Sequence, residues 1–140
     1  MTDTNGQVLE FRLSEETYCV SIDHVTEIVD VGELTKVPNS PAHIEGVMDL
    51  RGRTTSIVDP KTVFGIDGEG SAHRIIVFDP EITGDAQAAG WLVDEVSQVV
   101  QVDYGDVDEA PAADKDSIKG VIKGEEGEFV IWVDPEKVHS

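Results

Sequence analysis

Cysteine, basic residues and long apolar runs are all scarce in this 140-residue chain. The single cysteine, Cys19, cannot form an intrachain disulfide, and the chain has no run of about 18 apolar residues with which to span a membrane. Residues 1–7 are polar and lack the basic and apolar stretches of a secretory signal peptide. These absences predict a cytoplasmic protein that does not insert into membranes.

Basic residues are outnumbered by acids, with 10 Lys and Arg against 29 Asp and Glu and a net charge of −19. Such a surface would repel a phosphate backbone, so nucleic acid is excluded as a partner. Hydrophobic residues still make up 39% of the chain, which is enough for a core and argues against disorder. Because molar salt screens self-repulsion, we expect a protein of a halophilic archaeon; an acidic mesophilic protein is the open alternative.

Residue patterns for catalysis or metal binding are missing as well. The four histidines are scattered without His-x-x-x-His spacing, and there is no Cys-x-x-Cys pair. Cys19 lies in a predicted strand with no histidine implied beside it, so we interpret it as a buried structural thiol. The sequence therefore predicts a protein that is not an enzyme and has no metal site and no cofactor.

Branched aliphatic residues dominate the apolar content, with 20 Val and 11 Ile against five Leu. Val and Ile are stiff at χ1 and suit strands better than helices. Strands this short and closely spaced are typical of a β-barrel or of paired barrels, and no long helix is expected. Alternating or continuous apolar patterns predict strands at residues 8–13, 18–22, 46–51, 54–58, 74–78, 88–93, 98–102, 117–123 and 129–133.

Three of these strands end in Asp-Pro, at residues 59–60, 79–80 and 134–135. Aspartate is a good N-cap and proline is tolerated in the first helical turn, so short helical turns are expected at residues 61–64 and 136–139. The copy at residues 79–80 is soon followed by Gly84, which predicts a plain turn there. Loops are expected at residues 37–41, 66–70 and 103–116, the last of them an acidic, solvated connection.

Residues 18–58 carry a more specific pattern. Asp23 can cap a short helix in which Val25, Ile28 and Val29 form an apolar stripe at i, i+3 and i+4. The motifs that follow one another along the chain are Val25-Thr26-Glu27-Ile28, Pro38-Asn39-Ser40-Pro41, Gly46-Val47-Met48-Asp49-Leu50-Arg51-Gly52, Val93-Asp94-Glu95-Val96, Ile118-Lys119-Gly120-Val121 and Trp132-Val133-Asp134-Pro135.

In this order and at this separation, the motifs resemble those of the CheW-like family of chemotaxis coupling proteins, over nearly the whole chain. Asp49 departs from the family's usual Asn, which could alter local hydrogen bonding and charge. The resemblance implies an all-β fold of two packed SH3-like five-stranded β-barrel lobes with short helical turns. It also implies that residues 1–140 are a single CheW-like domain in which the two lobes are intertwined.

The resemblance further implies a non-catalytic adaptor that couples methyl-accepting chemoreceptors to the histidine kinase CheA. Its expected partners are the regulatory domain of CheA and the membrane-distal cytoplasmic tip of the chemoreceptors, and its expected location is the cytoplasm, at chemoreceptor arrays. The partner-binding residues that the resemblance implies are Val25, Glu27, Ile28, Gly46, Leu50 and Arg51.

Simpler roles are open for each of these residues. Val25 and Ile28 could be core residues, Gly46 could serve backbone geometry, and Glu27 and Arg51 could be an ordinary surface pair, if they pair at all. The alternative functions are a CheW-like regulatory domain of a larger kinase or receiver-fused coupling protein, a small-ligand-binding β-barrel, and an acid–base hydrolase. The placement of the motifs between residues 1 and 140 favours a free-standing adaptor.

Overall fold

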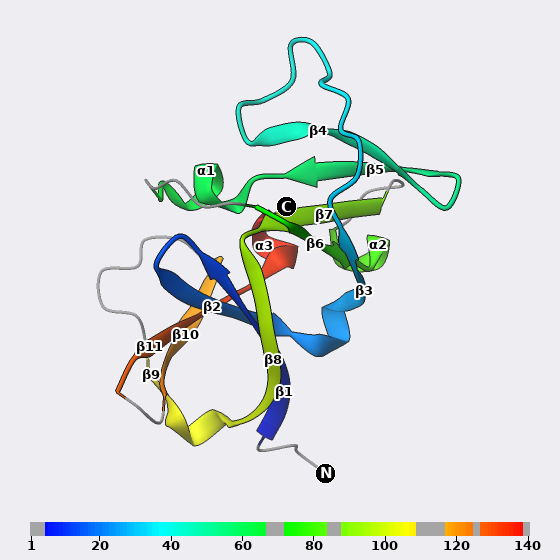
Figure 1. Ribbon diagram of the computed structural model, residues 1–140. Coiled ribbons are helices and arrows are strands. Elements are labelled where there is room, and N and C mark those ends of the chain that lie inside the picture. The colour runs from blue at the N-terminus through cyan, green and yellow to red at the C-terminus, as the bar shows by residue number, and fades with distance from the viewer. Residues whose placement is uncertain (1–4, 67–71, 84–87, 109–116, 125–126, 139–140) are drawn as a thin grey trace.

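Two curved β-sheets make up most of the computed structural model (Figure 1), which describes residues 5–66, 72–83, 88–108, 117–124 and 127–138. We call them lobe 1, in the lower half of Figure 1, and lobe 2, in the upper half. In spatial order, lobe 1 consists of β8 (Glu95–Asp103), β1 (Asn5–Leu13), β2 (Glu16–Ser21), β11 (Phe129–Val133), β10 (Ile118–Lys123) and β9 (Val107–Asp108). Lobe 2 consists of β3 (Val25–Asp30), β6 (Arg74–Phe78), β7 (Ala88–Val93), β5 (Arg53–Val58) and β4 (Ile44–Leu50).

The few helices are short, as the sequence predicts. The α-helices are α1 (Pro60–Phe64), α2 (Pro80–Thr83) and α3 (Pro135–Val138), and the 3-10 turns are η1 (Ile22–His24) and η2 (Tyr104–Asp106). The all-β prediction is confirmed, and lobe 1 adds a two-residue sixth strand, β9, to the expected five. Strand β9 and turn η2 occupy the beginning of the expected loop 103–116, whose residues 109–116 lie outside the described part, as do residues 67–71.

The two lobes are interleaved along the chain. Lobe 2 is contiguous, whereas lobe 1 takes β1 and β2 from before it and β8 to β11 from after it. One pair of strands is parallel in each lobe, β2 with β11 in lobe 1 and β5 with β7 in lobe 2. The other neighbouring strands are antiparallel.

Three apolar clusters hold this arrangement together. The largest lies between the lobes and is centred on Trp91, which is fully buried and meets Phe78 and Phe11 edge-on, with ring centroids 4.9 and 6.2 Å apart. Such aromatic contacts add to the free energy of burying the rings. The interior of lobe 1 contains Val8, Cys19, Val102, Val130 and Trp132, and the interior of lobe 2 contains Met48, Ile57, Ile75 and Val77.

Aspartate caps explain all three short helices. The Asp59 and Asp134 carboxylates accept backbone N–H bonds two residues on, each at 3.0 Å, which confirms the two helical turns expected there. Asp79 makes the same 3.0 Å contact with the N–H of Glu81, so the plain turn expected at residues 79–80 is wrong and helix α2 begins there. The side-chain cap outweighs the nearby glycine because it satisfies a backbone donor in the first turn. Residue 139 of the second expected turn lies outside the described residues.

The helix expected after Asp23 is also wrong. Residues 22–24 form only the 3-10 turn η1, and Val25, Ile28 and Val29 belong to strand β3. Along β3, half-buried and exposed residues alternate, and its backbone pairs with β6. Branched side chains favour a strand, and pairing with a neighbouring strand overrides the helical spacing that the same residues show.

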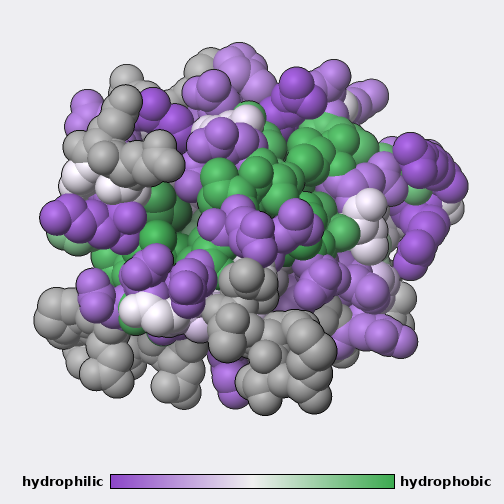
Figure 2. All heavy atoms as spheres, turned by 90° about the horizontal axis from the view of Figure 1, so that it is seen from below, coloured by the Kyte–Doolittle hydropathy of each residue, from purple (hydrophilic) through white to green (hydrophobic). Residues whose placement is uncertain are grey.

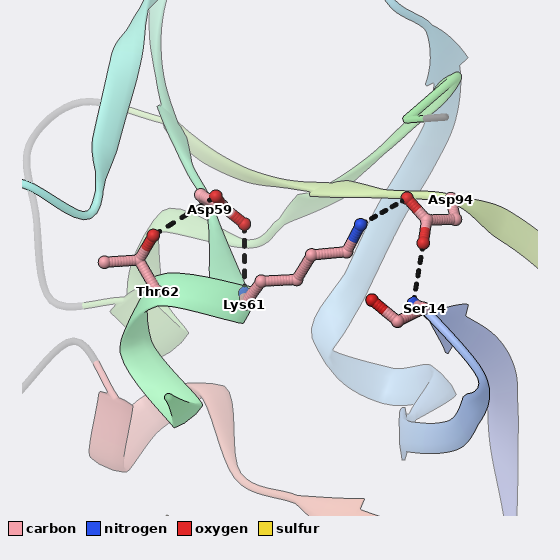
Figure 3. A network of polar contacts seen from close by, with 5 residues as sticks. All are labelled: Ser14, Asp59, Lys61, Thr62 and Asp94. Atoms are coloured by element: carbon pink, nitrogen blue, oxygen red, sulfur yellow. Dashed lines mark hydrogen bonds and ion pairs between the residues drawn. The ribbon is translucent and has the colours of Figure 1, made fainter. Parts of the chain in front are cut away.

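A polar network joins the two lobes (Figure 3). The Lys61 ammonium on α1 lies 2.8 Å from Oδ1 of Asp94, which sits between β7 and β8, and both side chains are largely buried. The other oxygen of Asp94 accepts the backbone N–H of Ser14 at 2.7 Å, in the turn between β1 and β2. One carboxylate therefore connects a helix of lobe 2 to a turn of lobe 1.

Candidate functional site

The residues implicated by sequence gather on lobe 2, along its two edge strands. Strand β3 has a neighbour only in β6, and β4 only in β5, among the described residues of the sheet. A tight turn at Arg51 and Gly52, with φ of +53° and +81°, connects β4 to β5. Glycine adopts such angles freely, and the turn directs the Arg51 side chain back towards β3.

Glu27 and Arg51 do pair. Nη2 of Arg51 lies 3.3 Å from Oε1 of Glu27, and Nη1 donates a hydrogen bond of 3.4 Å to Oε2. The Arg51 side chain is 78% exposed and that of Glu27 only 26%, so the pair contributes at most about 1 kcal/mol to stability. Oε1 of Glu27 is buried and has no donor with hydrogen-bond geometry among the described residues. Its contact with Arg51 is therefore an ion pair without hydrogen-bond geometry.

The apolar residues divide into exposed and supporting ones. Ile28 is 36% exposed and follows Glu27 on β3, with its side chain on the opposite face of the strand. Val25 is half-buried against the cluster between the lobes, and Leu50 is half-buried against the core of lobe 2. Ile28 can therefore contact another protein directly, whereas Val25 and Leu50 mainly position the strands.

Gly46 is buried and acts through the backbone. Its φ is +152°, and a Cβ atom there would lie 2.5 Å from the carbonyl oxygen of Thr35. Thr35 and Val47 exchange backbone hydrogen bonds of 2.9 and 2.8 Å beside it. Glycine is thus required for the segment before β4 to lie against that strand.

Two hollows flank these residues. The first, of about 180 Å³, brings together Glu27, Leu50 and Arg51 with Arg53, a residue that the sequence analysis missed. The signal for Arg53 was the Arg51-Gly52-Arg53 turn, which places both guanidinium groups on one side of a hairpin. The second hollow, of about 580 Å³, has an apolar part of Val29, Met48 and Leu50 and the acids Asp30, Glu33 and Asp49.

The single thiol of the chain, Cys19, is not activated as a nucleophile. Burial, reinforced by the Glu10 carboxylate, raises the pKa of the Cys19 thiol to about 12, so the group is neutral at physiological pH and a poor nucleophile. Among the residues that the structure describes, no group of three or more His, Cys, Asp or Glu side chains could hold a metal ion. No helix in the same residues is long and apolar enough to cross a membrane.

Comparisons with known proteins agree with this picture. Residues 7–140 match the family model described as CheW-like domain. The chain is 28% identical to chemotaxis protein CheW of Thermotoga maritima, over 94% of this chain and 86% of that protein. It is 29% identical to chemotaxis protein CheW of Rhizobium meliloti, over 96% and 89% of the two chains. The crystal structure of scaffolding protein TtCheW from Thermoanaerobacter tengcongensis is similar, with a TM-score of 0.82 and 31% identity over 94% of this chain and 86% of that one.

Proposed function

Because the chain belongs to the CheW-like domain family of chemotaxis scaffolding proteins, we propose that it joins the regulatory domain of the histidine kinase CheA to the cytoplasmic tip of methyl-accepting chemoreceptors. The protein is a non-catalytic scaffold of chemotaxis signalling with the fold of two SH3-like subdomains. The proposal includes a single intertwined domain over residues 1–140 and a location in the cytoplasm, at chemoreceptor arrays.

The observation that carries the proposal is the Glu27–Arg51 pair, which holds an exposed arginine at the edge of lobe 2; the exposed Ile28 is on the same edge strand. Arginine is one of the residue types that most often dominate protein–protein binding energy. The Arg51 side chain is 78% exposed although it is paired, so a partner can contact its guanidinium group without first breaking the pair. A partner that covers this edge would also bury the exposed part of the pair and strengthen it.

The remaining implicated residues have supporting roles in this proposal. Val25 and Leu50 pack beneath the two edge strands, and Gly46 keeps β4 beside residue 35. Apolar contacts at Ile28 would contribute more than long-range charge steering in concentrated salt, since salt screens charges and strengthens apolar burial.

A binding assay with the full chain tests the proposal. The chain is immobilised and offered, separately, a chemoreceptor signalling tip and the regulatory domain of the kinase. We expect Glu27→Gln and Arg51→Glu to weaken binding of at least one partner by about tenfold or more, because the first removes a charge from the contact and the second reverses one. Failure of the unmodified chain to bind either partner would reject the coupling role.

Arg74→Glu is the matched control. Arg74 also pairs with an acid on β3, at 3.4 Å from Asp30, but both side chains are at least half exposed and lie at the other end of the strand. We expect this variant to bind both partners within about twofold of the unmodified chain. If Arg74→Glu weakens binding as much as Arg51→Glu, the loss reflects overall charge and the site is wrongly placed.

A further inference from the structure

Lobe 1 has an open seam between its first and last strands. Strand β8 pairs with β1 on one side, and no described residue forms backbone hydrogen bonds with its other side. The equivalent seam of lobe 2, between β3 and β4, is crossed by the chain itself, because Thr35 bonds to Val47 of β4. The sheet of lobe 2 is thus partly closed, whereas the sheet of lobe 1 is open within the described residues.

The open seam is a large hollow with an apolar floor. It has a volume of about 1000 Å³ and is bordered by β8 on one side and by β9, β10 and β11 on the other. Val100, Val102, Ile122 and Val130 line it, and all four belong to the apolar cluster inside lobe 1. Figure 2, which views the molecule from below, shows that hydrophobic side chains reach the surface between hydrophilic ones. The floor therefore favours apolar side chains of an occupant.

The free side of β8 is protected by a register shift opposite Glu10 and Phe11 but by few charged residues. Residues 96–102 of β8 read Val-Ser-Gln-Val-Val-Gln-Val and contain no charged residue and no proline, although 28% of the chain is charged. Val99 in this stretch is 47% exposed. Proteins commonly place lysines, prolines or other charges on free edges to prevent strand addition. Their absence from residues 96–102 leaves the backbone donors and acceptors of this stretch available to an added strand.

The rim of the seam is acidic. Lys123 is the one base among the residues that line it, and the acids are Glu10, Asp103, Asp106, Asp108 and Glu128. Asp103 also accepts the N–H of Gly105 at 2.9 Å, so its charge is fixed in place. A basic occupant matches this rim, whereas a second copy of a chain with net charge −19 would be repelled.

We propose that the seam of lobe 1 binds an extended segment of a partner protein, in which basic and apolar residues alternate, as an additional strand along β8. Apolar side chains of the segment lie on the floor formed by Val100, Val102, Ile122 and Val130, and basic side chains meet the acidic rim. The seam lies in lobe 1 and the Glu27–Arg51 pair lies in lobe 2, so this site is separate from the coupling site and does not depend on it.

A nine-residue peptide of alternating Lys and Val, with the same length as β8, is the probe. We expect it to bind the full chain in fluorescence anisotropy and to slow amide hydrogen exchange within residues 96–102. Three control peptides should each bind at least about tenfold more weakly. A peptide of the same composition with paired residues (KKVVKKVVK) lacks the alternating strand pattern, and a Glu/Val peptide lacks the positive charge. A fully N-methylated Lys/Val peptide lacks the backbone donors.

Charge reversal within the chain provides a second test. Asp106 and Asp108 are exposed, and the double variant Asp106→Lys/Asp108→Lys should weaken the probe about tenfold, with the circular dichroism spectrum unchanged. The matched control Asp23→Lys/Glu136→Lys makes the same change in net charge away from the seam and should bind as the unmodified chain does. Equal weakening by both variants, equal binding of the four peptides, or no protection of residues 96–102 would overturn the proposal. A β8-paired homodimer in sedimentation experiments would overturn it in favour of a second copy.

Discussion

Replacing Lys61 by methionine is expected to loosen the junction between the lobes. Methionine keeps most of the side-chain volume and removes the charge that faces Asp94. Among the described residues, the carboxylate would then keep only the N–H of Ser14 as a donor, at 2.7 Å, in a position where its side chain is 12% exposed. The variant thus isolates the effect of an unpaired charge at the lobe junction.

The size of the effect follows from the geometry. At 2.8 Å the Coulomb attraction is about 6 kcal/mol for an effective dielectric constant of about 20, and desolvation of both groups offsets most of it. Removing one partner leaves the desolvation of the other uncompensated, which costs about 3 kcal/mol for a mostly buried pair. A loss of about 3 kcal/mol corresponds to a fall of about 9 °C in Tm for a domain of this size.

Thermal and urea unfolding of the two proteins measure this difference. Arg74→Met is the matched control because Arg74 pairs with Asp30 at 3.4 Å with side chains 50% and 84% exposed, and its loss should cost less than about 0.5 kcal/mol. A Lys61→Met variant as stable as Arg74→Met would refute the reasoning. A double variant Lys61→Met/Asp94→Leu should recover part of the loss, since an apolar pair leaves no charge unpaired.

Three further predictions concern stability. Gly46→Ala should destabilise the fold by about 1–3 kcal/mol in urea unfolding, because a Cβ atom would lie 2.5 Å from the Thr35 carbonyl oxygen; Gly52→Ala, which has free space around the added Cβ atom, should cost less. Because the pKa of Cys19 is raised, the unfolded chain loses the thiol proton from about pH 9, whereas the folded chain keeps it to about pH 12. The contribution of the neutral thiol to the free energy of unfolding is therefore complete below about pH 9. It declines as the pH rises, by up to about 1.4 kcal/mol per pH unit. Unfolding at about pH 8 and pH 10 measures the decline, which Cys19→Ala should reduce. The net charge of −19 predicts that the free energy of unfolding rises between about 0.1 and 2 M KCl, and a flat response would contradict the expected adaptation to salt.

Strands that are buried on both faces could be predicted to the residue. Residues 75–78, 88–93 and 129–133 are continuous apolar runs, and the strands predicted at 74–78, 88–93 and 129–133 match β6, β7 and β11. Strand β3 was missed because its branched residues also fit helical spacing, and only its pairing with β6 distinguishes the two. Strand β9 has two residues, which is too short for any periodic pattern to appear.

The sequence predicted which residues belong to the candidate site, but it did not predict how their side chains are arranged. Motif order identified the residues around Glu27 and Arg51, but their contact joins positions 24 residues apart and depends on where the β4–β5 turn directs Arg51. The seam of lobe 1 left no local pattern, since it arises from the spatial order of strands that are distant in sequence. Both features follow from tertiary pairing, which a single sequence does not display.

The parallel pairing of β2 with β11 has a consequence for the order in which the chain folds. Val130 pairs with Thr17, so a strand at the beginning of the chain must wait for one near residue 130 before the sheet of lobe 1 is complete. Lobe 2, in contrast, draws all its strands from residues 25–93. During synthesis lobe 2 can form first and serve as the surface on which lobe 1 assembles, while strands β1 and β2 stay exposed until the last strand emerges.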